Sequence, residues 1–204
     1  SSFLVSGRRT YGFDLAQPFI RQTDFAGTNY FFYDLNAKMN YQFSQKDRIY
    51  LSGYFGRDVL TFAQPGRDFQ FTLPYGNATA TLRWNHLFTE KLFFNLSAIY
   101  NDYQFKAGFE QEEFNFDIFS GVRDFTAKFD FDYFPSNDHQ VKTGIHATKH
   151  RLTPNIIRGS AGETEFENTA TAKYANEYAI YLQDDWKINP WLRVNLGLRG
   201  TLFQ

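Results

Sequence analysis

Residues 181–199 alternate between apolar and polar side chains on both sides of a single turn. After the turn, aliphatic residues alternate with residues that are polar or glycine. The aliphatic ones are Leu192, Val194, Leu196 and Leu198, and the others are Arg193, Asn195, Gly197 and Arg199. A period of two places one set on each face of a β-strand. Asn189 and Pro190 supply the turn, because proline fixes φ and has no amide hydrogen to donate. The stretch therefore predicts a β-hairpin with one apolar face and one polar face.

The same alternation recurs along the whole chain. We expect nine strands, at residues 2–11, 33–43, 48–57, 76–88, 92–105, 116–133, 140–152, 177–186 and from 192 onward. Most of these runs exceed the ~5–6 residues of an ordinary strand, and about 9–11 tilted residues are enough to cross a bilayer. We expect no helix of useful length. The fold class predicted is all-β, with sequential antiparallel strands.

The connections between these strands sort by length. Short turns are expected at residues 44–47, 89–91, 135–138 and 188–191, and long loops at 12–29, 58–75, 106–115 and 153–176. Short turns at one end and long loops at the other are typical of outer-membrane β-barrels. A soluble Greek-key sandwich would not sort its loops in this way. The short turns would then be periplasmic.

Composition narrows the choice of protein class. Aromatic residues make up 20% of the 204 residues, which suits strands and the aromatic girdles of a membrane barrel. The formal net charge of −1 gives no electrostatic case for nucleic acid. The chain has no cysteine, which excludes a disulfide framework. It also lacks the run of about 18 apolar residues that a transmembrane helix requires.

The alternation assigns side chains to three environments in a barrel wall. Those predicted to face lipid are Leu35, Met39, Leu82, Leu96, Phe129, Val194 and Leu196. Those predicted to form a periplasmic aromatic girdle are Tyr41, Phe88, Trp186 and Trp191. Those predicted to face the lumen are Lys38, Arg83, Lys128, Asp130, Asp132, Lys142, Arg193 and Arg199. A wet interior tolerates these charges, and their mixed signs allow pairing across strands.

Several segments resemble the barrel of a TonB-dependent outer-membrane receptor of the type common in Bacteroidota. The segments are SFLVSGRRTY (2–11), YDLNAKMNYQFS (33–44), DRIYLSGYFGRD (47–58), GNATATLRWNHLF (76–88), FDYFPSNDHQVKTG (131–144) and YLQDDWKINPWLRVNLGLR (181–199). The resemblance implies a 22-stranded barrel in the bacterial outer membrane, with a plug in its lumen. It also implies import of a bulky nutrient with energy passed on by TonB.

On this resemblance, residues 1–204 are part of one transmembrane barrel domain. We expect the plug and a TonB-contacting region before residue 1, and the remaining strands after residue 204. An open sheet edge in lipid would leave backbone groups unpaired at several kcal/mol each, so these strands require partners. Further expected partners are outer-membrane lipid and a surface lipoprotein or other members of an outer-membrane complex.

The sequence contains no catalytic constellation, and we expect neither enzyme activity, nor a cofactor, nor a bound metal. His146 and His150 share a face but stand about 13 Å apart along a strand, too far for easy joint ligation. Glu110, Glu112 and Glu113 could ligate calcium, although a charge run in an external loop is usually only solvated. Asp184 falls on the predicted lipid face and is tolerable only near the periplasmic end.

Three functions compete at this point. The first is uptake of a bulky solute through the barrel. The second is a passive scaffolding role for a receptor-like barrel in a larger outer-membrane complex. The third, an outer-membrane enzyme, is weak because no nucleophile–base pair or carboxylate dyad stands out. A plug with a TonB-binding segment in the whole protein would favour transport over scaffolding.

Overall fold

The residues that the structure describes form one antiparallel sheet of ten strands and one short helix. The computed structural model describes residues 1–204 apart from 24–25, 65, 67 and 169. The elements are β1 Ser2–Arg9, α1 Gly12–Ile20, β2 Asn29–Gln42, β3 Asp47–Ala63, β4 Phe69–Thr89, β5 Leu92–Gln111, β6 Phe114–Tyr133, β7 His139–Ala161, β8 Thr164–Glu167, β9 Lys173–Asn189 and β10 Leu192–Phe203.

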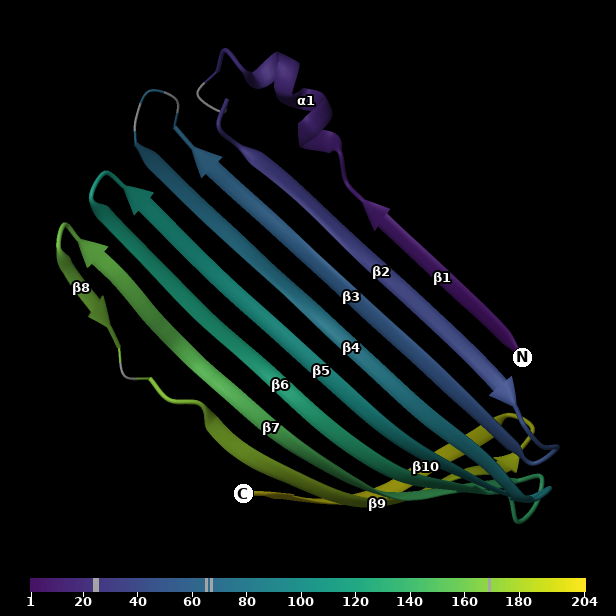
Figure 1. Cartoon of the computed structure of the whole chain (residues 1–204). Helices are drawn as coiled ribbons and strands as arrows, with labels where there is room; N and C mark the ends of the chain where they lie inside the picture. Colours follow the sequence, from purple (N-terminus) through teal and green to yellow (C-terminus); the bar gives the residue numbers. More distant parts are fainter. Residues whose placement is uncertain (24–25, 65, 67, 169) are drawn as a thin grey trace.

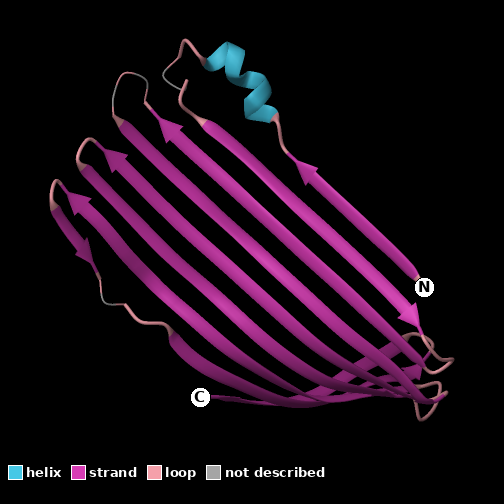
Figure 2. Ribbon diagram, viewed as in Figure 1, coloured by secondary structure: helices cyan, strands magenta, loops and turns pink. Residues whose placement is uncertain are grey.

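The strands follow one another across the sheet in sequence order (Figure 1). The order is β1-β2-β3-β4-β5-β6-β7-β9-β10, and the short β8 pairs with the far end of β7. Among the described residues, β1 pairs only with β2, and β10 pairs only with β9. The sheet is curved and open (Figure 2). The predicted all-β, sequential, antiparallel class is therefore confirmed.

The nine predicted strands correspond to the nine strands of the main order, but the prediction of long loops between them is wrong in extent. The described part of the chain adds only the short β8 to these strands, and β7 alone runs for 23 residues. Most of the expected loops at 58–75, 106–115 and 153–176 are strand. Two prolines within these strands lie at interruptions of the hydrogen-bond ladders. Pro74 is unpaired toward β5, and Pro154 is unpaired toward β6, where a missing N–H costs nothing.

The expected loop at 12–29 contains the helix α1, which the sequence analysis did not predict. Its Gln17 side chain donates to the carbonyl oxygen of Thr28 at 3.2 Å, and Phe13 packs edge-on against Tyr30. Leu15 and Phe19 are exposed. No helix in the described part of the chain is long and apolar enough to cross a membrane.

The register of the ladders gives the sheet two distinct faces. Directly paired residues share a face, and apolar residues pair with apolar residues from strand to strand. Leu51 pairs with Leu82, and Leu82 pairs with Ala98. Buried side chains lie on the opposite, polar face, namely Asp34, Ser97, Ala175 and Ala179. We call these two sides the apolar face and the polar face.

Candidate functional site

The apolar face carries all seven residues predicted to contact lipid. The ladders connect them through paired neighbours on the same side of the sheet: Leu35, Met39, Leu82, Leu96, Phe129, Val194 and Leu196. Large apolar side chains on this face are exposed, with Leu82 at 49% and Leu196 at 61%. Their contact with lipid remains a prediction, but the structure gives them no protein covering.

The four girdle residues lie at the short-turn end of the sheet. Tyr41 is next to last in β2, Phe88 is next to last in β4, and Trp186 lies near the end of β9. Trp191 lies in the turn between β9 and β10 and is 83% exposed. A membrane–water interface favours such amphipathic rings. Their position at a periplasmic interface remains a prediction.

Two histidine–aspartate pairs on the apolar face were missed by the sequence analysis. His86 Nδ1 lies 2.6 Å from Asp47 Oδ1, which also accepts a hydrogen bond from Trp84 Nε1 at 3.0 Å. His139 Nδ1 lies 2.7 Å from Asp184 Oδ2. Both pairs lie close to short turns, where Asp184 was expected to be tolerable. The sequence gives no signal for them, because the partners are 39 and 45 residues apart.

The polar face carries all eight residues predicted to face the lumen: Lys38, Arg83, Lys128, Asp130, Asp132, Lys142, Arg193 and Arg199. Some of them make cross-strand contacts of the expected kind. Lys142 Nζ lies 3.4 Å from Asp132 Oδ1, and Arg193 Nε lies 3.3 Å from Asp185 Oδ1. The pairing of mixed charges is consistent with a hydrated wall.

Two histidines on the polar face are held by carboxylates. His146 Nε2 lies 2.9 Å from Asp130 Oδ1, which also accepts a hydrogen bond from the Tyr181 hydroxyl at 2.7 Å. His150 Nδ1 lies 2.8 Å from Asp124 Oδ1. In the part of the chain that the structure describes, no three histidine, aspartate or glutamate side chains converge as metal ligands. The arrangement forms a hydrogen-bonded polar surface.

The acidic segment takes a form other than the expected open loop. Glu110 belongs to β5, and Glu112 and Glu113 form a tight turn between β5 and β6. Glu112 has a φ of 52°, which is uncommon outside glycine. The acidic segment is thus the turn of a hairpin that joins the long strands β5 and β6.

A family model described as "Outer membrane beta barrel domain" matches residues 103–204. That range is half of the chain, and the chain therefore belongs to this family of bacterial outer-membrane β-barrels. The apolar face without protein cover and the sequential antiparallel sheet agree with the assignment. No curated protein matches the chain.

Two solved receptors share the fold. One is the ferric yersiniabactin uptake receptor FyuA from Yersinia pestis, with a TM-score of 0.56 and 11% identity over 82% of this chain and 27% of that chain. The other is BauA, the ferric preacinetobactin receptor from Acinetobacter baumannii, with a TM-score of 0.59 and 11% identity over 85% of this chain and 34% of that chain. The chain thus spans about a quarter to a third of the length of these receptors.

Proposed function

We propose that this chain is part of the wall of a TonB-dependent transporter of the Bacteroidota type, which imports a bulky nutrient. The wall would belong to a 22-stranded barrel, completed by a plug and further strands of the whole protein. Its partners would be outer-membrane lipid and, through the N-terminal region of the whole protein, TonB. We infer a transport role because the polar face carries the paired mixed charges of a hydrated wall.

One observation carries this proposal. The large apolar side chains of the apolar face are exposed, while buried residues such as Asp34 and Ser97 lie on the polar face. A water-soluble sheet would bury its apolar side against other protein. A barrel in lipid exposes the apolar side and encloses the polar side. The likeness to the two siderophore receptors supports a large barrel over a small one.

Spin labels at neighbouring residues test the orientation of the faces. The chain has no cysteine, so single cysteines can be introduced at Leu96 and, as the matched control, at Asn95. In the full-length protein in lipid, a nitroxide at 96 should be relaxed mainly by oxygen, which partitions into hydrocarbon. A nitroxide at 95 should be relaxed mainly by a water-soluble nickel chelate. The reverse pattern would overturn the proposed orientation.

Uptake in cells tests the transport role. Cells that express the full-length protein should accumulate a nutrient from a panel of ferric siderophores, corrinoids and oligosaccharides. Uptake should stop when TonB is deleted, while the amount of folded protein in the outer membrane stays unchanged. Accumulation that is independent of TonB, or no accumulation from any member of the panel, would favour the scaffolding role.

A further inference from the structure

Cations gather on the apolar face at a distance from the short turns. Ladder pairing places Arg57, Lys106, Arg123, Lys149 and Arg151 on this face, on strands β3, β5, β6 and β7. Arg123 Nη2 lies 2.7 Å from Asp102 Oδ2 and neutralises that carboxylate. Among the described residues, none of the other four forms an ion pair.

Other charges on this face lie farther toward the strand ends. Arg158 Nε pairs with Glu167 Oε1 at 2.9 Å, and Asp117 lies opposite Gly108 and Arg158 in the ladders. That pair cancels. Three other carboxylates, Glu110, Asp117 and Glu165, also lie on this face toward the strand tips, which leaves the four unpaired cations in excess by one. The group made of Arg57, Lys106, Lys149 and Arg151 therefore presents net positive charge outward. We call it the basic patch.

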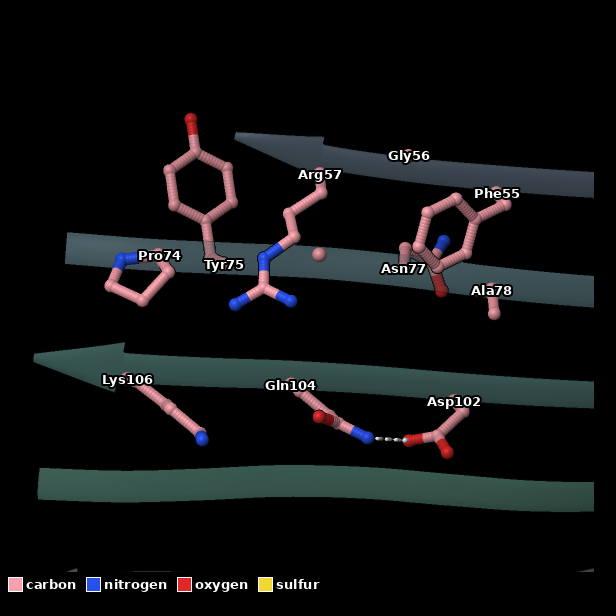
Figure 3. A pocket seen from close by; sticks show the side chains of 11 residues that line it. Phe55, Gly56, Arg57, Pro74, Tyr75, Asn77, Ala78, Asp102, Gln104 and Lys106 are labelled. Carbon is pink, nitrogen blue, oxygen red and sulfur yellow. Dashed lines mark hydrogen bonds between the residues drawn. The ribbon is translucent and has the colours of Figure 1, made fainter. Parts of the chain in front are cut away.

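A hollow of about 230 Å³ with both polar and apolar lining lies within this region. Its lining includes Arg57, Gly76, Asp102, Gln104 and Lys106. Figure 3 shows Arg57 reaching from β3 across β4, and Lys106 extending from β5 toward the next strand, where its Nζ lies 5.6 Å from the centre of the Phe119 ring. A Cβ at Gly76 would come within 2.8 Å of the Gly56 carbonyl oxygen and 3.6 Å of Arg57 Cγ, so β3 and β4 approach closely beside the hollow.

An apolar groove of about 500 Å³ adjoins the hollow on the same face. Four alanines form its floor, and larger side chains bound it: Ala80, Ala98, Ala127 and Ala147, with Leu51, Leu82, Tyr100, Phe125 and Tyr178. Ala98, Ala127 and Ala147 are direct ladder partners. Ala80 follows Ala78 of the hollow by two residues, or about 7 Å along the strand.

The depth of the two features matches the layers of a bilayer. Gly76 precedes Thr89, the end of β4, by 13 residues, which is ~43 Å of strand and ~33 Å of height at a tilt of about 40°. That height is beyond an apolar band of ~25 Å. Ala80 lies ~23 Å high by the same estimate, inside the upper edge of the band. The hollow lies at headgroup level and the groove at acyl-chain level.

We propose that this surface binds one phosphate-bearing lipid of the outer leaflet, of the lipid A class. Arg57 and Lys106 would contact a phosphate in the hollow, and Lys149 and Arg151 would add to the attraction from the neighbouring strand. An acyl chain would occupy the alanine-floored groove below. The inference rests on the proposed outward orientation of the apolar face, and charge complementarity selects an anionic lipid over a neutral one.

Native mass spectrometry of the full-length protein tests this proposal. The protein is titrated in detergent with bisphosphorylated lipid A, with the same lipid after removal of its phosphates, and with inorganic phosphate alone. Wild-type protein should retain the bisphosphorylated lipid and bind the phosphate-free form at least tenfold more weakly. Equal retention of both lipids, or retention of phosphate alone, would overturn the proposal without any need for a variant.

Matched variants locate the site. The double substitution Arg57→Gln and Lys106→Gln should weaken binding by about 25-fold, at about fivefold for each cation removed near a membrane surface. Lys38→Gln with Lys128→Gln removes the same charge from the polar face and should change binding less than twofold. Ala127→Phe fills the groove and should weaken binding of the acylated lipid, whereas Ile145→Phe outside the groove should not. Equal losses in the matched pairs would overturn the assignment.

Uptake measured in the same cells separates the two proposals. Wild-type protein that binds lipid A but imports nothing from the panel would overturn the transport role and leave the lipid site standing. Wild-type protein that imports nutrient and binds both lipids equally would overturn the lipid site alone. Heat-modifiable gel mobility checks that each variant is folded before its lipid binding is scored.

Discussion

The two faces of this sheet differ in chemistry and also in how closely their residues are packed. On the apolar face Ile145 is 54% exposed and Leu182 is 55% exposed, whereas on the polar face Ser97 is 3% exposed and Ala179 is 4% exposed. Curvature brings side chains together on the inner side and separates them on the outer side. The polar face therefore has the more closely packed and more buried side chains. In a soluble domain the apolar face would be the buried one.

A charge placed on each face should give the largest contrast. Leu96→Arg puts a cation into the middle of the apolar band and should lower the free energy of unfolding by about 2–4 kcal/mol. Asn95→Arg places the same side chain on the polar face, where water reaches it, and should cost much less. Urea unfolding of the full-length protein in lipid vesicles measures both. Equal losses of unfolding free energy would mean that both faces are in contact with the same solvent, and not one with lipid and the other with water.

A methyl group added to each face should give a smaller contrast. A Cβ on Gly144 would come within 2.6 Å of the Phe129 carbonyl oxygen and 2.8 Å of the Tyr181 ring, so Gly144→Ala should destabilise the fold by about 1–3 kcal/mol. On the apolar face, a Cβ on Gly53 would come no closer than 3.7 Å to the Thr79 carbonyl oxygen. Gly53→Ala should therefore be neutral or slightly stabilising. A larger loss at Gly53 would contradict the difference in packing.

The faces were predictable from the sequence, because a period of two assigns sides without any knowledge of register. The ends of the strands were not. Pro74 indicates a loop in isolation, yet it lies inside β4, which begins at Phe69 and pairs Pro74 with Val59 of β3. A proline interrupts a strand only where the adjacent strand requires a backbone N–H donor at that position. The pairing of the strands shows whether it does, and the sequence does not.

The candidate lipid site was not predictable for a related reason. Its cations lie on β3, β5 and β7, and their spacing in the sequence has no pattern. Arg57 pairs with Gly76, and Lys106 follows Gln104, the other partner of Gly76, by two residues, so only the registers of two ladders bring them to one hollow. The alanines of the groove likewise come from β4, β5, β6 and β7. Period-two reasoning places each residue on a face but gives no position across the sheet.

Removal of one hydroxyl from each face should separate hydrogen bonding from packing. Tyr181 on the polar face donates to Asp130 Oδ1 at 2.7 Å, so Tyr181→Phe should cost about 1–2 kcal/mol. Tyr178 lies on the apolar face, where it borders the groove. Tyr178→Phe should change the free energy of unfolding by less than about 0.5 kcal/mol. A cost at 178 that matches the cost at 181 would contradict the assignment of the hydrogen-bonded network to the polar face.

The smallest expected effect is the most informative about water on the polar face. Lys142 Nζ lies 3.4 Å from Asp132 Oδ1, with side chains 41% and 23% exposed. A hydrated pair of this kind contributes about 0.2–1 kcal/mol and is screened by salt. Lys142→Gln should therefore cost no more than that at low salt, and the cost should vanish near 1 M salt.

Lys38→Gln is the matched control, because among the described residues Lys38 forms no ion pair. Its substitution should change the free energy of unfolding little at any salt concentration. A dry polar face would give a different result, since loss of one partner from a buried pair costs about 3–5 kcal/mol and is barely screened. A large, salt-independent loss at Lys142 would thus rule out a water-filled lumen against this face, whereas a small, salt-sensitive one requires that water reach it.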